Sequence, residues 1–166
     1  MNRIKNHKQA GFTMLEMMIV VVIIGITASM AAPSFFDWIP NMKLKGEAKQ
    51  NLNYLRQARS KAVAENNQYG VYFDVDNKQL YFFKDTHQPS NAIYSNGADS
   101  LIEGPIDMES NFEYSDCTFN NNTVIFFSDG SASTSGSIDI ERPEQAEYFI
   151  ISLLAATGKV KLERSS

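Results

Sequence analysis

The hydrophobic and polar positions first define a long apolar stretch near the start of the chain. From Phe12 to Ala32 the residues are almost all apolar, and Glu16 is the one charged residue among them. A helix of this length spans about 30 Å, the thickness of the hydrocarbon core of a bilayer. The stretch predicts a transmembrane helix, in which a carboxylate is costly and points to a function. An interfacial acid that extends toward water is the alternative.

The next stretch, residues 37–67, predicts an amphipathic continuation of this helix. Pro40 and Gly46 are poor helix-interior residues and predict a bend or a local opening within residues 33–46. Asn66-Asn67 predicts the end of the helix. One face should pack on the rest of the chain, because a set of mostly apolar residues recurs at helical spacing, namely Ala48, Leu52, Leu55, Ala58 or Arg59, and Ala62.

After Asn67 the pattern changes to short stretches of aromatic and β-branched residues separated by turn residues. Asp76-Asn77-Lys78 predicts a hairpin between the first two. Residues 84–111 are weakly patterned and predict a variable loop with one short strand at Leu101 to Glu103. The fold class expected is α+β, a long N-terminal helix packed on an antiparallel sheet. The strands expected are residues 69–75, 79–83, 112–114, 123–127, 137–140, 148–154 and 160–162.

The residues before the apolar stretch carry only positive charge. Arg3, Lys5 and Lys8 lie among residues 1–11, which contain no acid. The positive-inside rule then places the N-terminus in the cytoplasm and everything after the helix outside. A cleaved secretory signal is the alternative, since Met30-Ala31-Ala32 imitates its cleavage site. The apolar region of a secretory signal is usually about 7 to 15 residues long, which is shorter than the apolar stretch of this chain.

The junction Gly11-Phe12-Thr13-Met14-Leu15-Glu16 resembles the class III signal of type IV pilins and type II secretion pseudopilins. The resemblance implies that a prepilin peptidase cleaves between Gly11 and Phe12 and methylates the new terminal amine of Phe12. It also implies that Glu16 pairs with the terminal amine of a neighbouring subunit during filament assembly, and that Pro33 kinks the helix. Such a pairing is physically reasonable, because a carboxylate in apolar surroundings needs a cation.

Three later segments resemble the GspH/FimT (FimU) family of minor pilins and pseudopilins. They are Leu55 to Val63 at the helix end, Val124 to Gly130 with its aspartate-glycine turn, and Thr157 to Leu162. In that family these segments recur in this order, and a type IV pilin-like fold is implied. The family usually has arginine where this chain has Lys159, and lysine cannot make bidentate contacts as arginine does.

Candidate catalytic and metal-binding residues are scarce. Beyond the leader the sequence has one histidine, His87, and one cysteine, Cys117, too few for the usual His/Cys zinc sites. It contains neither a phosphate-binding P-loop motif nor a G-x-S-x-G motif. The sequence therefore predicts no enzyme, no cofactor and no metal. A single cysteine allows no intrachain disulfide, and Cys117 is expected to be a small buried hydrophobe.

Charge is distributed unevenly along the chain. Residues 37–66 contain six basic and three acidic residues, which favours a solvated helix face or attraction to anionic lipids or to acidic neighbours in a filament. From residue 67 onward six basic residues face fifteen acidic ones, a balance that should repel DNA phosphates. A local cluster of Lys159, Lys161 and Arg164 leaves DNA binding for natural transformation as the alternative function.

The sequence thus predicts four regions. They are a prepilin leader (1–11), a transmembrane and filament-core helix (12–36), an amphipathic continuation (37–67) and a β-sheet domain (68–166). The function implied is that of a structural subunit of a type II secretion pseudopilus or type IV pilus in the bacterial inner membrane, with its C-terminal domain in the periplasm. The partners implied are prepilin peptidase and other subunits, with secreted cargo or DNA as further candidates.

Overall fold

The computed structural model describes residues 11–86, 92–143 and 147–165, and leaves out the side chains of residues 31–37. The chain divides into two compact units, Met1–Pro40 and Asn41–Ser166. One long helix, α1 (Met14–Glu65), begins in the first unit and ends in the second. Pro33 and the kink predicted there lie outside the described side chains, so the kink stays a prediction.

The described part of the first unit is helical from Met14 and contributes nothing to a core. All side chains of residues 11–30 are exposed, including the large apolar ones. The hydroxyl of Thr27 donates to the carbonyl of Ile23 at 2.9 Å and the hydroxyl of Ser29 to that of Ile26 at 2.7 Å. Within the residues that the structure describes, no helix is both long and apolar enough to cross a membrane. The predicted membrane span therefore stays a prediction.

In the second unit, α1 buries one face along its whole length. Leu44 and the predicted residues Ala48, Leu52, Leu55, Ala58 and Ala62 are all at most 5% exposed. The helix runs without a break through Gly46, so the predicted local opening does not occur there. It ends as predicted, because Asn66 adopts a left-handed conformation with φ 49° and the amide of Asn67 donates to the carbonyl of Ala62 at 3.2 Å.

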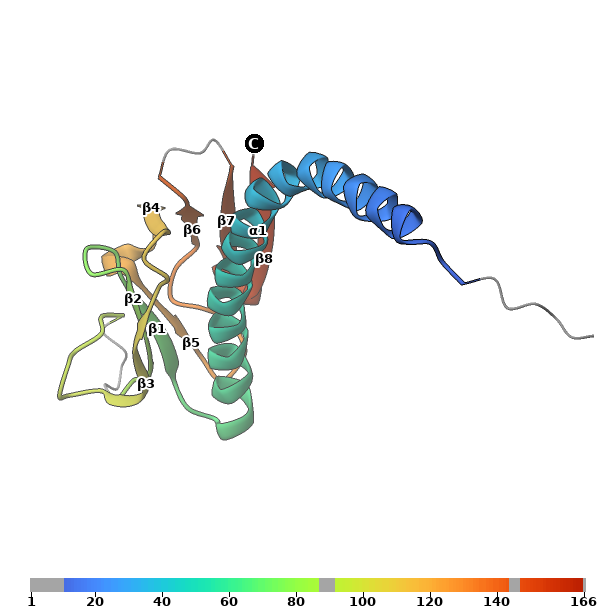
Figure 1. The fold of residues 1–166 in the computed structure, drawn as a ribbon. Helices are drawn as coiled ribbons and strands as arrows, with labels where there is room; N and C mark the ends of the chain where they lie inside the picture. Colours follow the sequence, from blue (N-terminus) through green and yellow to red (C-terminus); the bar gives the residue numbers. More distant parts are fainter. Residues whose placement is uncertain (1–10, 87–91, 144–146, 166) are drawn as a thin grey trace, which may run out of the picture. The chain divides into compact units, whose positions relative to one another are not determined.

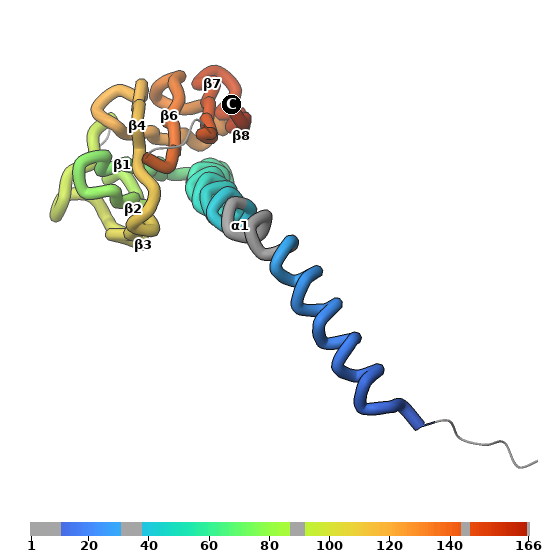
Figure 2. The backbone as a smooth tube through the Cα atoms, turned by 45° about the horizontal axis from the view of Figure 1, so that its top comes forward, coloured from blue at the N-terminus to red at the C-terminus, as the bar shows by residue number. Residues whose placement is uncertain are grey.

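Two four-stranded antiparallel sheets complete the second unit (Figure 1). Figure 2 shows the strands of the two sheets as separate groups beside α1. The first sheet, sheet A, has the order β3-β2-β1-β5, and the second, sheet B, has the order β4-β6-β7-β8. Sheet A contains β1 (Tyr69–Asp74), β2 (Gln79–Lys84), β3 (Ser100–Asp107) and β5 (Thr123–Phe126), and sheet B contains β4 (Glu113–Cys117), β6 (Gly136–Glu141), β7 (Tyr148–Leu154) and β8 (Lys159–Ser165).

A single hydrophobic core joins α1 to the inner faces of both sheets. Sheet A contributes Val71, Phe73 and Phe82, and sheet B contributes Ile138 and Ile151, all of them fully buried. Among the residues whose burial the structure describes, every core residue lies between Leu44 and Leu153, within the unit Asn41–Ser166. The predicted α+β architecture is confirmed, with two sheets in place of one.

The main difference from the sequence prediction is β3. Eight residues, Ser100–Asp107, form this strand within a segment predicted to be mostly loop. Gly104 and Pro105 interrupt the strand pattern of the sequence, and Pro105 has no amide proton to donate. The strand tolerates both because β3 is the edge of sheet A, where one side of the backbone needs no partner. Two short 3-10 helices, η1 (Asn120–Asn122) and η2 (Ala155–Thr157), were not predicted either.

Candidate functional site

The N-terminal candidate residues lie at the exposed start of α1. Gly11 and Phe12 precede the helix, and the Phe12 side chain is 80% exposed. Thr13 is the N-cap, since its hydroxyl oxygen accepts a hydrogen bond from the amide of Glu16 at 3.2 Å. The residues Thr13 and Glu16 have the spacing of a capping box, and an acid in the first turn is also favoured by the helix dipole. Glu16 therefore has a local structural role that the sequence interpretation did not consider.

The three family-like segments of the second unit meet at the side chain of Arg59. Its Nε donates to the carbonyl oxygen of Gly130 at 3.0 Å, and its Nη2 donates to that of Thr157 at 2.9 Å. One guanidinium thus joins α1 to the turn after β5 and to η2 before β8. We call these three residues together with Gly158 the Arg59 junction. It ties the helix to parts of the chain that belong to different sheets.

Gly158 is the closest-packed residue of the Arg59 junction. It is buried and adopts a left-handed conformation with φ 58°. A Cβ atom at this position would lie 2.0 Å from the carbonyl oxygen of Gly130 and 2.8 Å from Nε of Arg59. Only glycine fits there, for reasons both of space and of backbone conformation. The glycine of the Thr157-Gly158-Lys159 segment is therefore required by the junction.

The turn that presents Gly130 is held by Asp129. Its carboxylate accepts hydrogen bonds from the amide of Ser131 at 2.9 Å and from the hydroxyl of Ser131 at 2.6 Å. These bonds stabilise the charged form and lower the pKa of Asp129 below its usual value. The aspartate-glycine turn therefore orients the Gly130 carbonyl that Arg59 binds.

A surface groove of about 830 Å³ lies along the Arg59 junction. Its cationic residues are Arg56, Arg59 and Lys159, and its apolar lining includes Val63 and Val160. The guanidinium of Arg59 is engaged by two carbonyls, whereas Arg56 and Lys159 form no ion pair within the described part of the chain. The lining of the groove is thus partly basic and partly apolar.

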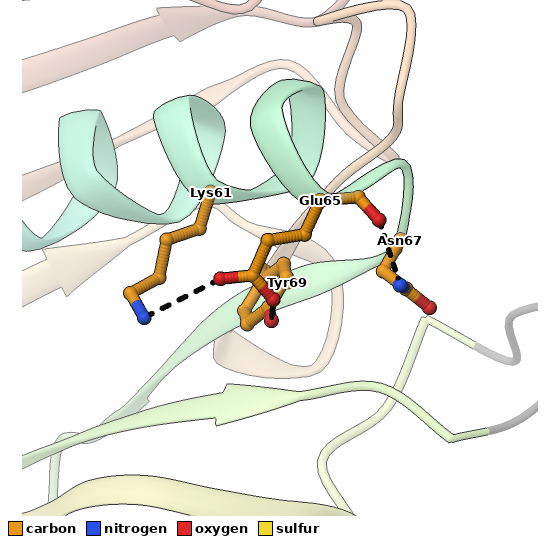
Figure 3. A network of polar contacts seen from close by, with 4 residues as sticks. All are labelled: Lys61, Glu65, Asn67 and Tyr69. Atoms are coloured by element: carbon orange, nitrogen blue, oxygen red, sulfur yellow. Dashed lines mark hydrogen bonds and ion pairs between the residues drawn. The ribbon is translucent and has the colours of Figure 1, made fainter.

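The helix end that follows is stabilised by a small polar network (Figure 3). Tyr69 donates a short hydrogen bond from its hydroxyl to the carboxylate of Glu65, which also lies 3.7 Å from Nζ of Lys61. Asn67 donates to the backbone carbonyl of Glu65 at 2.9 Å. The bond from Tyr69 is the main cause of a lowered pKa of Glu65, and burial followed by that same bond raises the pKa of Tyr69 to about 12.

The three C-terminal basic residues proposed as a DNA site are not alike in the structure. Lys161 pairs with Glu163, and Arg164 pairs with Glu147. Lys159 lines the groove beside the Arg59 junction. Two of the three positive charges are therefore balanced by neighbouring carboxylates, which weakens the cluster as a phosphate-binding surface.

Cys117 lies at the end of β4, half-buried against the core. Burial is the main cause of a raised pKa of its thiol, so the reactive thiolate is disfavoured. Its predicted role as a packed side chain agrees with this position. His87, the one histidine after the leader, lies outside the described residues. Within the described residues, no group of three or more His, Cys, Asp and Glu side chains could hold a metal ion.

Comparisons with known proteins agree with the geometry. Residues 47–156 match the family described as type II transport protein GspH, and residues 6–32 match the prokaryotic N-terminal methylation motif. A stretch of 67 residues, 40% of this chain, is 42% identical to the type IV major pilin protein PilA of Myxococcus xanthus (strain DK1622). That match spans 30% of the relative's length.

Two solved structures show the same fold. The minor pseudopilin EpsH from the type 2 secretion system of Vibrio cholerae has a TM-score of 0.56 at 16% identity, over 73% of this chain and 96% of that one. The type IV minor pilin FimU of Pseudomonas aeruginosa has a TM-score of 0.57 at 16% identity, over 76% of this chain and 92% of that one. The chain therefore belongs to the GspH family of pilin-like structural subunits, which are not enzymes.

Proposed function

We propose that this chain is a minor pilin or pseudopilin, a structural subunit of a type II secretion pseudopilus or a type IV pilus. Prepilin peptidase would cleave between Gly11 and Phe12 and methylate the amine of Phe12. The new N-terminus then lies four residues before Glu16, one helical turn away. The carboxylate of Glu16 would pair with the terminal amine of a neighbouring subunit and set the register of assembly.

The observation that carries this proposal is the exposed apolar start of α1. Every described side chain from Gly11 to Met30 is exposed, although most are large and apolar. An exposed apolar surface of this extent needs either a lipid or a protein partner. In a filament, neighbouring helices of the same kind would cover it, and van der Waals packing would hold them together.

We also propose that the same helix anchors the subunit in the inner membrane before assembly, with the second unit in the periplasm. The hydroxyls of Thr27 and Ser29 support this, since both donate to carbonyls of the preceding helical turn. In a bilayer, polar side chains must be satisfied within the protein. The basic residues Arg3, Lys5 and Lys8 would keep the N-terminus in the cytoplasm.

The test separates the two roles of Glu16. Glu16→Gln keeps the spacing of the capping box but removes the charge. Thr13→Ala removes the N-cap but keeps the charge. Each variant would be expressed in cells, and its amounts in the inner membrane and in sheared filaments would be measured by immunoblot.

We expect Glu16→Gln to remain in the membrane and to be reduced about tenfold in filaments, a loss equivalent to about 1.4 kcal/mol. Thr13→Ala should incorporate nearly normally, because one N-cap contributes about 1 kcal/mol to a helix that packing also stabilises. Normal incorporation of Glu16→Gln, or equal losses in both variants, would show that the charge pairing is wrong.

A further inference from the structure

The guanidinium of Arg59 is held in place, yet it keeps hydrogen-bond donors that the fold does not use. An arginine side chain has five N–H donors in one rigid plane. Two of them, on Nε and Nη2, donate to the carbonyl oxygens of Gly130 and Thr157. Within the described residues the other donors, on Nη1 and Nη2, form no hydrogen bond, and Arg59 is exposed. A carboxylate can bind such a guanidinium through two parallel hydrogen bonds.

Two further cations line the same groove. Arg56 lies three residues before Arg59 on α1, and Lys159 follows Gly158 at the start of β8. Both side chains are exposed, and in the part of the chain that the structure describes neither forms an ion pair. Among the described residues that line the groove there is no aspartate or glutamate. The groove therefore presents three positive charges that no acid in its lining balances.

The charge of the groove is opposite to that of the sheet region as a whole. From residue 67 onward the chain has fifteen acidic and only six basic residues, one of which is Lys159. A long polyanion such as duplex DNA would extend beyond the groove and approach these acids. A short acidic segment fits within the groove, and repulsion by the acids disfavours its binding elsewhere. The charge distribution therefore favours a short acidic ligand over a nucleic acid.

The remaining lining of the groove favours a peptide over an inorganic anion. Val63, which is 51% exposed, and Val160 contribute apolar surface beside the cations. A ligand gains free energy by burying this surface only if it carries apolar atoms close to its charge. In addition, β8 is the edge strand of sheet B, so among the described strands only β7 pairs with it. Extended peptides bind sheet edges of this kind through their main chain.

From these observations we propose that the groove beside the Arg59 junction binds a short, extended acidic segment of a protein other than this chain. One carboxylate of the segment accepts hydrogen bonds from the unused donors of Arg59, and further carboxylates lie near Arg56 and Lys159. An apolar side chain of the segment covers Val63 and Val160. The site lies in the folded region and does not involve Glu16, so this inference goes beyond the proposed function and can fail independently of it.

Peptide binding can be measured by fluorescence anisotropy on residues 41–166, the unit that contains every described core residue. The probe is a fluorescein-labelled hexapeptide of alternating aspartate and leucine, in about 0.1 M salt, where the Debye length is about 10 Å. We expect saturable binding of this peptide. The same peptide with asparagine in place of aspartate should bind at least about tenfold more weakly. No binding of the acidic peptide, or equal binding of both peptides, would overturn the proposal.

Substitutions locate the binding surface. R56Q/K159Q removes the two cations of the groove that have no role in the Arg59 junction, and it should weaken binding of the acidic peptide at least about tenfold. The matched control, K45Q/K49Q, removes two exposed positive charges of α1 outside the groove lining and should bind like the unmodified protein. Circular dichroism checks that each variant is folded. Equal losses in the two variants would mean that net charge alone governs binding, and would contradict the assigned site.

The apolar part of the site has a test of its own. Val63→Ser should weaken binding of the aspartate-leucine peptide about threefold and leave binding of an aspartate-serine peptide unchanged. Equal effects on both peptides would show that no apolar side chain of the ligand lies on Val63.

Two other occupants of the groove are outcomes of the same measurements. A fluorescein-labelled DNA duplex that binds more tightly than the acidic peptide, and loses its binding in R56Q/K159Q, would identify a phosphate site and overturn the proposal. Self-association of residues 41–166 in sedimentation velocity that is lost in R56Q/K159Q would identify a second copy of this chain as the occupant, and would also overturn it. Since Glu16 is absent from residues 41–166, these outcomes are distinct from those of the test of the proposed function.

Discussion

Residues 14–30 and residues 41–65 of α1 are both helical, yet their apolar side chains have different surroundings. In the first stretch all side chains are exposed, whereas in the second a stripe from Leu44 to Ala62 is buried against two sheets. The second stretch is stabilised by the protein's own core. The first has its backbone hydrogen bonds but no tertiary packing of its own among the described residues. One helix can therefore serve a folded domain at one end and leave its other end available for partners.

The Arg59 junction should be the most sensitive part of the folded region. Gly158→Ala would place a Cβ atom 2.0 Å from the Gly130 carbonyl in a backbone conformation with φ 58°. We expect a loss of about 4 kcal/mol in the free energy of unfolding of residues 41–166, measured by urea denaturation. The control is Gly46→Ala on α1, where an added Cβ has no atom within 4 Å. It should stabilise the helix by about 0.5 to 1 kcal/mol, and equal effects at both glycines would contradict the junction.

The two stretches of α1 should respond differently when a large apolar side chain is replaced by alanine. Leu55 is 0% exposed in the core, so Leu55→Ala should lower the free energy of unfolding by about 3 kcal/mol. Met18 is 63% exposed, so Met18→Ala in the full chain should leave the thermal unfolding of the sheet region unchanged. The measurement is differential scanning calorimetry in detergent. A lower melting temperature for Met18→Ala would show that the first stretch also contributes to the fold.

The smallest effect should come from acid titration of Glu65. Its pKa is lowered from 4.5 in the folded protein, mainly by the bond from Tyr69, so its contribution to stability is present above pH 4.5 and lost as the pH falls below it. The melting temperature should therefore fall less between pH 6 and pH 3 in Glu65→Gln than in the unmodified protein. Asp76→Asn, at an exposed turn, is the control. An unchanged pH profile for Glu65→Gln would show that the Tyr69 bond does not favour the carboxylate.

Local patterns predicted most of the secondary structure. The stripe of Ala48, Leu52, Leu55 and Ala62 identified the buried face of α1, because helical periodicity and burial are directly related. The strands were also predicted from a local pattern, because runs of aromatic and β-branched residues such as Phe, Tyr and Ile are typical of strands. The prediction failed at β3, where Gly104 and Pro105 are compatible with a strand only because the strand lies at a sheet edge. Edge position is a property of the assembled sheet.

The candidate site was only partly predictable. The residues from Gly11 to Glu16 form a contiguous motif, and their function is proposed from that motif. The sequence predicted no bonding partner for Arg59, because its two carbonyl partners lie 71 and 98 residues away along the chain. The recurrence of three separate family-like segments was the one signal in the sequence that could have indicated this meeting point.

By itself the sequence determined the long helix, its two contrasting stretches, the α+β class and the resemblance to pilin-like subunits. These features depend on local periodicity and on contiguous motifs, which require no knowledge of distant neighbours. Only the tertiary structure decided that the strands form two sheets and that Arg59 joins them to α1. Each of these depends on which remote segments pair, and that pairing is established by burial of a common core.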